Sequence, residues 1–290
     1  MAVLGSKERE ELGRADPAAL VTAVLDEEAR RHDAQAAAVD APVIADDLLP
    51  GVGSDDLPMG DVLRAGGISM VGVLAGLVLV DNLSNSAFAV LGPEIQKSLA
   101  MSDLVLGVVG ALGGLVIFAA AIPLGYLGDR TRRTSLVGLC SLVWAGFVML
   151  TGAAQAVWQL VIAWGAAGLG KANEQPIHSA LLADSYPIEG RNRIYALHRA
   201  AQPVGLVIGP VLAGGIAAVA GGGSGWRWAF VVLSIPAAVL GLVAFGLSEP
   251  KRGRNEMQSV LGEEMTEEGE LRIPIAAAFA RLKKIKTFYF

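Results

Sequence analysis

The sequence predicts an all-α membrane protein built from six transmembrane helices. The chain of 290 residues has a mean hydropathy of +0.51, and only 18% of its residues are charged, whereas soluble domains average about 25%. Apolar segments of roughly twenty residues or more recur along it, and this is the length that an α-helix needs to cross a hydrocarbon core about 30 Å thick. Short polar links separate these segments.

Residues 1–64 predict an acidic cytosolic N-terminal tail. Up to Val62 they hold fourteen acidic and five basic residues, and no aromatic residue precedes Phe88. Such a composition is typical of a chain that buries no core of its own. Asp16 followed by Pro17 is a helix-start signal, so one helix is expected inside the tail. A docking helix for a partner is the alternative interpretation of that segment.

Residues 65–248 predict the six-helix transmembrane bundle. Each apolar segment reaches the length of one span, and none is long enough to cross twice. The expected spans are residues 68–91, 104–127, 135–154, 157–186, 193–220 and 228–247.

Lysine and arginine are divided unevenly between the two sets of links. With the N-terminus inside, nine of them lie in cytoplasmic links, while only Lys97 and Arg227 lie on the opposite side. Positive charge in short loops stays on the cytoplasmic side of a membrane. The sequence therefore predicts a multi-pass protein of the plasma (cytoplasmic) membrane with a cytoplasmic N-terminus.

The link between the second and third spans holds a charged cluster, GYLGDRTRRT, at residues 125–134. A carboxylate beside guanidinium groups forms charge-assisted hydrogen bonds, and such bonds can be exchanged when neighbouring helices shift. The arginines could also be topology signals alone. That interpretation explains their sign, but it explains neither Asp129 nor the two glycines.

This link resembles the signature loop of the major facilitator superfamily of transporters. The matching residues are Gly125, Gly128, Asp129, Arg130 and Arg133. The resemblance implies that the bundle equals the N-terminal six-helix half of that fold, and that the cluster is a conformational latch between two halves. It also implies that residues 249–290 are a cytosolic central linker running into a truncated seventh helix.

The fifth span carries a second resemblance. Its segment GLVIGPVLAGG is similar to the antiporter motif of the superfamily, although Ala213 stands where that motif usually has glycine. The matching residues are Gly205, Gly209, Pro210 and Gly214. The segments SDLVLG, LLADSYPIEGRNRIYAL and WRWAF also resemble the superfamily, with a looser likeness to its Spinster-like and multidrug branches.

Polar residues inside two of the spans predict a substrate and proton cavity. A charge within a membrane helix costs about 2.5–3.5 kcal/mol on insertion scales, so it usually faces a polar cavity. One set lies on a single face of the first span and the other on a single face of the fourth span. The two sets are Asp81, Ser84 and Asn85, and Lys171, Glu174, Gln175 and His178.

The first and fourth helices both line the central cavity of the resembled fold, so an ion pair between Asp81 and Lys171 is expected. Two interpretations of this pair stay open. Protonation of Asp81 or Glu174 could break it and couple protons to transport, or the pair could only neutralise buried charge. His178 and His198 are candidates for a proton relay, or for hydrogen-bonded packing residues.

The sequence predicts no cofactor, no metal ion, no nucleic-acid partner and no enzymatic activity. It holds no GxxxxGK[ST] phosphate loop, no nucleophile elbow, no HExxH and no cluster of residues at metal-ligand spacing. The expected partners are a small-molecule substrate, protons, the lipid bilayer, and a second six-helix half or a second copy.

The resemblance implies a secondary active transporter, namely a proton-coupled exporter or antiporter of a small organic molecule that works by alternating access. The alternative is a non-transporting membrane module, or a truncated and inactive transporter fragment.

Overall fold

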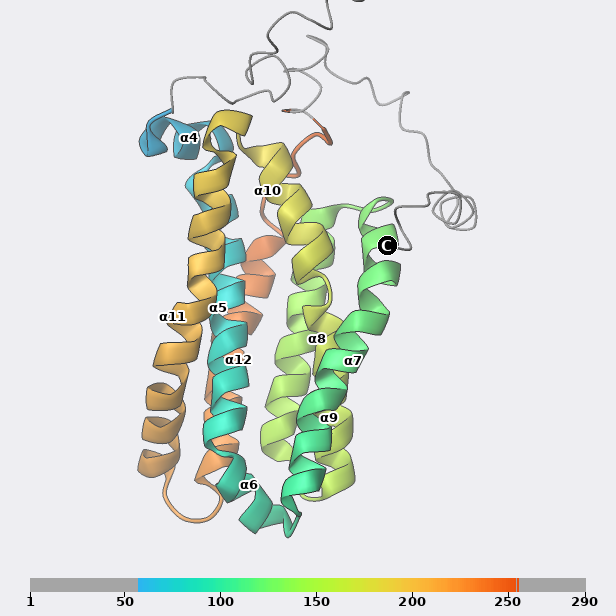
Figure 1. The fold of residues 1–290 in the computed structure, drawn as a ribbon, viewed down its shortest axis with the longest axis vertical. Coiled ribbons are helices and arrows are strands. Elements are labelled where there is room, and N and C mark those ends of the chain that lie inside the picture. Colours follow the sequence, from blue (N-terminus) through green and yellow to red (C-terminus); the bar gives the residue numbers. More distant parts are fainter. Residues whose placement is uncertain (1–56, 254, 256–290) are drawn as a thin grey trace, which may run out of the picture. The chain divides into compact units, whose positions relative to one another are not determined.

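The structure is a computed structural model that describes residues 57–253 and residue 255. Within these residues every regular element is a helix (Figure 1), which confirms the all-α prediction. The helix expected inside the tail and the segment expected to run into a seventh helix lie outside the described residues.

Between residues 57 and 253, five helices are long and apolar enough to cross a membrane. Their ends lie within five residues of the predicted ends, because long apolar runs define a span more sharply than local propensity does. They are α5 (Ile68–Val90), α7 (Asp103–Gly128), α8 (Arg133–Ala153), α11 (Ile188–Ala220) and α12 (Gly225–Ala244).

The fourth predicted span, residues 157–186, is not one continuous helix, and the prediction was wrong on this point. It is divided into α9 (Val157–Lys171), the π-helix η1 (Glu174–His178) and α10 (Ser179–Ser185). Pro176 has no N–H to donate and its ring crowds the preceding turn, so the regular ladder cannot continue. The amide side chain of Asn173 donates to the Gly170 carbonyl at 2.5 Å and satisfies one group that the break frees.

Two short helices that the sequence did not predict flank α5 at its two ends (Figure 1). They are α4 (Met59–Gly66) and α6 (Gly92–Leu99). Each has eight residues, which is too short to stand out in a search for membrane spans. The first crosses the boundary expected at residue 64, and it ends where Gly67 takes the positive φ of 79°.

Close helix crossings hold the bundle together where glycine removes the side chain. A Cβ atom at Gly205 would lie 2.5 Å from the Leu79 carbonyl oxygen, and one at Gly209 would lie 2.8 Å from that of Leu83. The backbones of α5 and α11 therefore touch at two successive turns of the predicted antiporter-like motif. Gly214 of the same motif has open space around it within the described chain.

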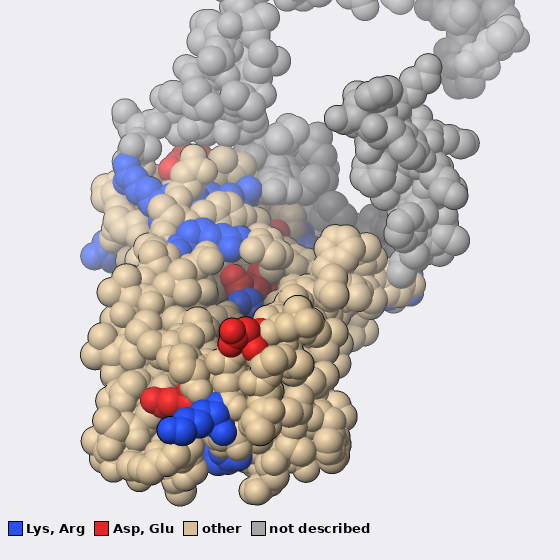
Figure 2. Space-filling view, turned by 60° about the horizontal axis from the view of Figure 1, so that its bottom comes forward, with Lys and Arg blue, Asp and Glu red and all other residues tan. Residues whose placement is uncertain are grey.

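The helices differ in how much of their surface the bundle covers. The percentages refer to an apolar stretch of 18 residues in each helix. The bundle buries 67% of this stretch in α5, but only 11% in α7 and 22% in α11. Figure 2, which brings the lower end of Figure 1 forward, shows a mostly uncharged surface with few acidic and basic side chains. Apolar faces of this size fit lipid or other membrane helices.

We predict that Gly209→Ala destabilises the bundle by about 1–3 kcal/mol, because the new methyl group overpacks the α5–α11 crossing. Thermal unfolding of the purified chain in detergent, followed by circular dichroism, measures the effect. Gly214→Ala is the matched control, since a Cβ there meets no atom of the described chain within 4 Å. Equal unfolding temperatures for the two variants would contradict the close crossing.

Candidate functional site

An ion pair lies inside the bundle between α5 and α9. The Lys171 ammonium pairs with Oδ2 of Asp81, and the Asn85 amide donates to the same oxygen at 3.1 Å. Asp81 is 6% exposed, so the pair sits in an environment of low dielectric, where either charge alone would be costly. This pair was expected from the resemblance to a fold in which the first and fourth helices line one cavity.

An open cavity of about 230 Å³ lies on one side of the pair. Its wall on α7 is formed largely by glycine, and aromatic rings form the opposite wall. Its lining includes Ser84, Asn85, Phe88, Gly110, Gly114, Trp144, Trp164 and Lys171. A smaller hollow on the other side of the pair is lined by Glu174 and His178, together with Asp81 and Lys171. The pair thus separates two hollows.

The break in the fourth span turns Glu174 and Gln175 toward α11. Arg199 lies 3.6 Å from the Glu174 carboxylate and donates to the Gln175 side chain at 2.6 Å. Arg199 was not among the predicted site residues. The sequence does place this basic residue inside a span, next to His198. It does not show that the fourth helix breaks and turns Glu174 toward Arg199.

The two predicted histidines meet in the interior. His178 Nδ1 and His198 Nε2 lie 3.3 Å apart, and both rings are buried. Such a hydrogen bond needs at least one neutral imidazole, because one nitrogen must accept. No group of three potential ligands that could hold a metal ion occurs in the described part of the chain.

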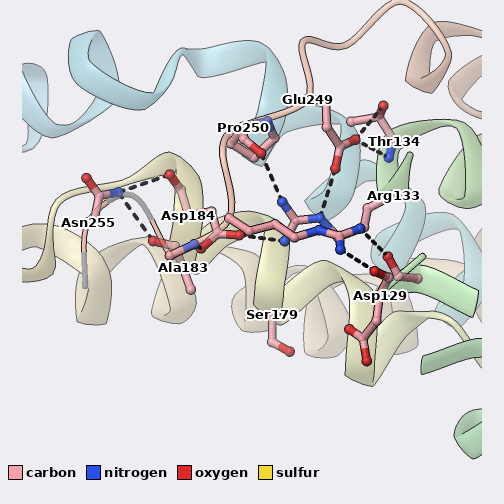
Figure 3. Close-up of polar contacts among 12 residues, drawn as sticks. Asp129, Arg133, Thr134, Ser179, Ala183, Asp184, Glu249, Pro250 and Asn255 are labelled. Atoms are coloured by element: carbon pink, nitrogen blue, oxygen red, sulfur yellow. Dashed lines mark hydrogen bonds and ion pairs between the residues drawn. The ribbon is translucent and has the colours of Figure 1, made fainter. Parts of the chain in front are cut away.

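A second polar centre lies where α8, α10 and the segment after α12 meet (Figure 3). The Arg133 guanidinium pairs with Asp184 at 2.5 Å and with Glu249 at 2.8 Å, and it donates to the Pro250 carbonyl at 3.0 Å. Arg133 is 5% exposed. Three chain segments therefore depend on one buried cation.

Glu249 also caps the start of α8. Its Oε2 accepts from the backbone N–H of Thr134 at 2.9 Å and from the Thr134 hydroxyl at 3.0 Å. Burial raises the pKa of this carboxyl, but the bonds from Thr134 and Arg133 outweigh burial and hold the pKa below the ordinary value of 4.5. The carboxylate form is thus the one that the fold stabilises.

Side chains of residues 252 and 255 satisfy the carbonyl groups at two helix ends. Arg252 donates to the carbonyl groups of Gly128, Asp129 and Thr131 at the end of α7. The Asn255 amide lies near the end of α10 (Figure 3), where it donates to three carbonyl groups. Carbonyl groups in the last turn of a helix have no partner within that helix.

The structure separates the members of the predicted latch. Arg133 is buried in the network described above, whereas Asp129 is exposed, and its carboxylate makes no hydrogen bond or ion pair with any described residue. The Arg130 guanidinium lies 4.2 Å from the centre of the Tyr126 ring. A Cβ at Gly128 would lie 3.2 Å from Ile177, so this glycine lets α7 pack closely against η1.

Comparison with known proteins decides the family. The sequence model of the Major Facilitator Superfamily matches residues 74–288. The chain belongs to the major facilitator superfamily. Its structure resembles that of a bacterial homologue of the human lysosomal transporter Spinster, in an inward-facing and unoccupied conformation, with a TM-score of 0.61 and 20% identity. That match covers 76% of this chain and 50% of the other, and it confirms the fold.

Curated relatives include members of the superfamily from bacteria and animals. An MFS-type efflux pump of Mycolicibacterium smegmatis is 29% identical over 171 residues, which are 59% of this chain and 39% of the pump. A sphingosine-1-phosphate transporter of Danio rerio is 29% identical over 188 residues, which are 62% of this chain and 37% of the relative. The chain thus matches less than half the length of these relatives.

We predict that Arg133→Ala destabilises this superfamily member by about 3–5 kcal/mol, because it leaves Asp184 buried without its cation. The exposed neighbour provides the control: Arg132→Ala is expected to change the free energy of unfolding by less than about 0.5 kcal/mol. Detergent unfolding curves of the purified variants give both values. Similar losses in the two variants would show that Arg133 is not the centre of the network.

Proposed function

We propose that the chain forms the N-terminal half of a secondary active transporter that exports a small organic molecule in exchange for protons. Membership of the superfamily and the similarity to a sphingosine-1-phosphate transporter support transport, and the similarity to an efflux pump supports export. Transporters of this kind move substrate by alternating access around a site near the middle of the membrane.

The observation that carries the proposal is the presence of two ion pairs in the fourth span, one on each side of its break. Asp81 pairs with Lys171, and Glu174 lies 3.6 Å from Arg199. Protonation of Glu174 removes one of the two contacts that hold Arg199 of α11 against η1, and the bond to Gln175 remains. Binding of a proton then changes the relative stability of two arrangements of α11 and the broken helix. Coupling requires such a difference between two states.

We further propose that transport needs a second six-helix half, supplied by another chain segment or by a second copy. The exposed Asp129 carboxylate supports this idea, since it has no partner in the described chain and its backbone is fixed by Arg252. The uncovered faces of α7 and α11 support it as well. In this proposal Asp129 latches the two halves on the cytoplasmic side in one transport state.

The proposed orientation places the charged ends of α7, α8 and α10 in the cytoplasm of a cell whose plasma membrane holds the protein. Nine basic residues on this side against two on the other support the assignment. The outer end then holds α6 and the α11–α12 link. There Arg227 donates to the carbonyl of Ala154 at 2.7 Å and to the hydroxyl of Ser98 at 3.0 Å.

We predict that Glu174→Gln abolishes proton coupling. One coupled proton changes substrate accumulation about tenfold per pH unit of gradient, and the variant should show no such dependence because glutamine does not titrate. Uptake of ethidium and Hoechst 33342 into inverted membrane vesicles, from cells that produce the chain with the second half, is the measurement.

The exposed carboxylate of Glu94 provides the matched control, since it lies on α6, far from the pair along α5. Glu94→Gln should retain the full dependence on the gradient. Absence of flux with the unmodified protein would contradict transport, and full gradient dependence in Glu174→Gln would contradict the proposed coupling residue.

A further inference from the structure

One face of α11 carries three polar side chains that contact the broken fourth span. They stand at positions i, i+3 and i+4 of the helix, and residues with this spacing share a face. These residues are Tyr195, His198 and Arg199. Their contacts form a polar seam between α11 and the segment that runs from η1 into α10.

Two contacts of the polar seam hold the far end of η1. The Tyr195 hydroxyl donates to the Ser179 carbonyl at 3.0 Å, and His198 Nε2 lies 3.3 Å from Nδ1 of His178. His178 is the last residue of η1, and Ser179 is the first residue of α10. Arg199 contacts the first two residues of η1, as described above. The seam therefore spans the whole π-helix.

The histidine contact is the part of the seam that is best shielded from water. His178 and His198 are 3% and 2% exposed, whereas the Arg199 side chain is 43% exposed. An exposed polar contact exchanges with water and contributes little, but a buried polar group that loses its partner keeps the full cost of desolvation. The bond between the two imidazoles is therefore the strongest constraint that the seam places on η1.

The rest of the broken span is fixed to α5 at both ends. At the end of α9, Lys171 pairs with Asp81. After α10, the Tyr186 hydroxyl donates to the Gly67 carbonyl at 2.5 Å and accepts from the Val71 N–H at 3.2 Å. The π-helix between these points is a rare and irregular element. Its orientation depends on the contacts made along its own length.

A second neighbour of η1, the helix α7, contacts it through apolar groups. A Cβ at Gly125 would lie 3.5 Å from the Pro176 side chain, and one at Gly128 would lie 3.2 Å from that of Ile177. Apolar packing is not directional, whereas a hydrogen bond has a preferred direction. The polar seam, rather than α7, thus sets how η1 is turned.

We infer that Tyr195 and His198 are positioning residues for the proposed coupling, since they hold η1 against α11 and thereby place the Glu174 carboxylate beside Arg199. Glu174 is the first residue of η1, so a rotation of η1 carries its side chain away from Arg199. This inference deepens the proposed function and rests on it.

The inference also decides between the two roles considered for the histidines. A proton relay needs a side chain that takes up and releases a proton near neutral pH, whereas a positioning contact needs only a hydrogen-bonding group at the place of Nε2. Glutamine supplies a donor and an acceptor but does not titrate, and methionine supplies at most a weak acceptor. His198→Gln and His198→Met therefore separate the two roles.

The first measurement is hydrogen exchange of residues 174–179, read by mass spectrometry on the 290-residue chain in lipid nanodiscs. Exchange of buried amides reports local opening. We expect exchange to be about tenfold faster in His198→Met, because His178 loses its buried partner. Tyr195→Phe, which removes one hydroxyl group, should accelerate it about threefold. His198→Gln should stay within about twofold of the unmodified chain, since the hydrogen bond is restored.

Thr151→Val is the matched control. Thr151 is buried and its hydroxyl donates to the Phe147 carbonyl at 3.0 Å within α8, so the variant loses a buried hydrogen bond outside the seam. Exchange of residues 174–179 should stay within about twofold of the unmodified chain, because distant sites act independently. Unchanged exchange in His198→Met, or equal acceleration in Thr151→Val, would overturn the inference.

The second measurement is gradient-dependent uptake in the inverted vesicles described above, with the second half present. His198→Met should lose most of the roughly tenfold dependence per pH unit, and His198→Gln should keep it. Loss of the dependence in His198→Gln with normal exchange would show that His198 carries the proton itself. Retained dependence in His198→Met despite faster exchange would show that the contact only stabilises the fold. Either result overturns the positioning role.

Absence of flux from the unmodified protein would contradict the proposed function, which is a separate result. The exchange measurement then still decides whether the polar seam holds η1, because it needs neither substrate nor the second half.

Discussion

The ion pair between Asp81 and Lys171 is the physical constraint at the centre of this bundle. A single charge in an apolar interior is costly, so each member requires the other, and the requirement keeps the end of α9 beside α5. Hollows on both sides of the pair are lined by its two side chains. The pair is thus at once a structural constraint and the polar end of the candidate binding site.

The broken fourth span connects the two polar centres of the molecule. Its middle segment η1 places Glu174 toward Arg199, while the following helix α10 carries Asp184 into the network around Arg133. In the proposed coupling, protonation of Glu174 acts on a short segment whose other end is fixed to α8 by the pair of Asp184 with Arg133. Coupling of this kind needs an element with two arrangements, and a π-helix followed by a seven-residue helix is a short enough element to provide one.

Much of this arrangement could be predicted from the sequence, because long apolar runs and charges within them are strong signals. The five long helices were predicted in this way, and the Asp81–Lys171 pair was expected because the first and fourth helices line one cavity in the resembled fold. The features that could not be predicted depend on single residues. Pro176 and Asn173 divide the fourth span, and the resulting turn brings Glu174 to Arg199. The network of Arg133 joins residues 51 and 116 positions apart, and no local pattern links such distant positions.

A double-mutant cycle on Asp81→Asn and Lys171→Met measures how far the two charges stabilise the bundle together. Unfolding free energies of the purified chain in detergent give the two single losses and the loss of the double variant. If the pair keeps the end of α9 beside α5, each single change costs about 3–5 kcal/mol, and the double variant loses less than the sum by about 1–3 kcal/mol. Strictly additive losses would contradict the account, since they would show that the two charges stabilise the fold independently of each other.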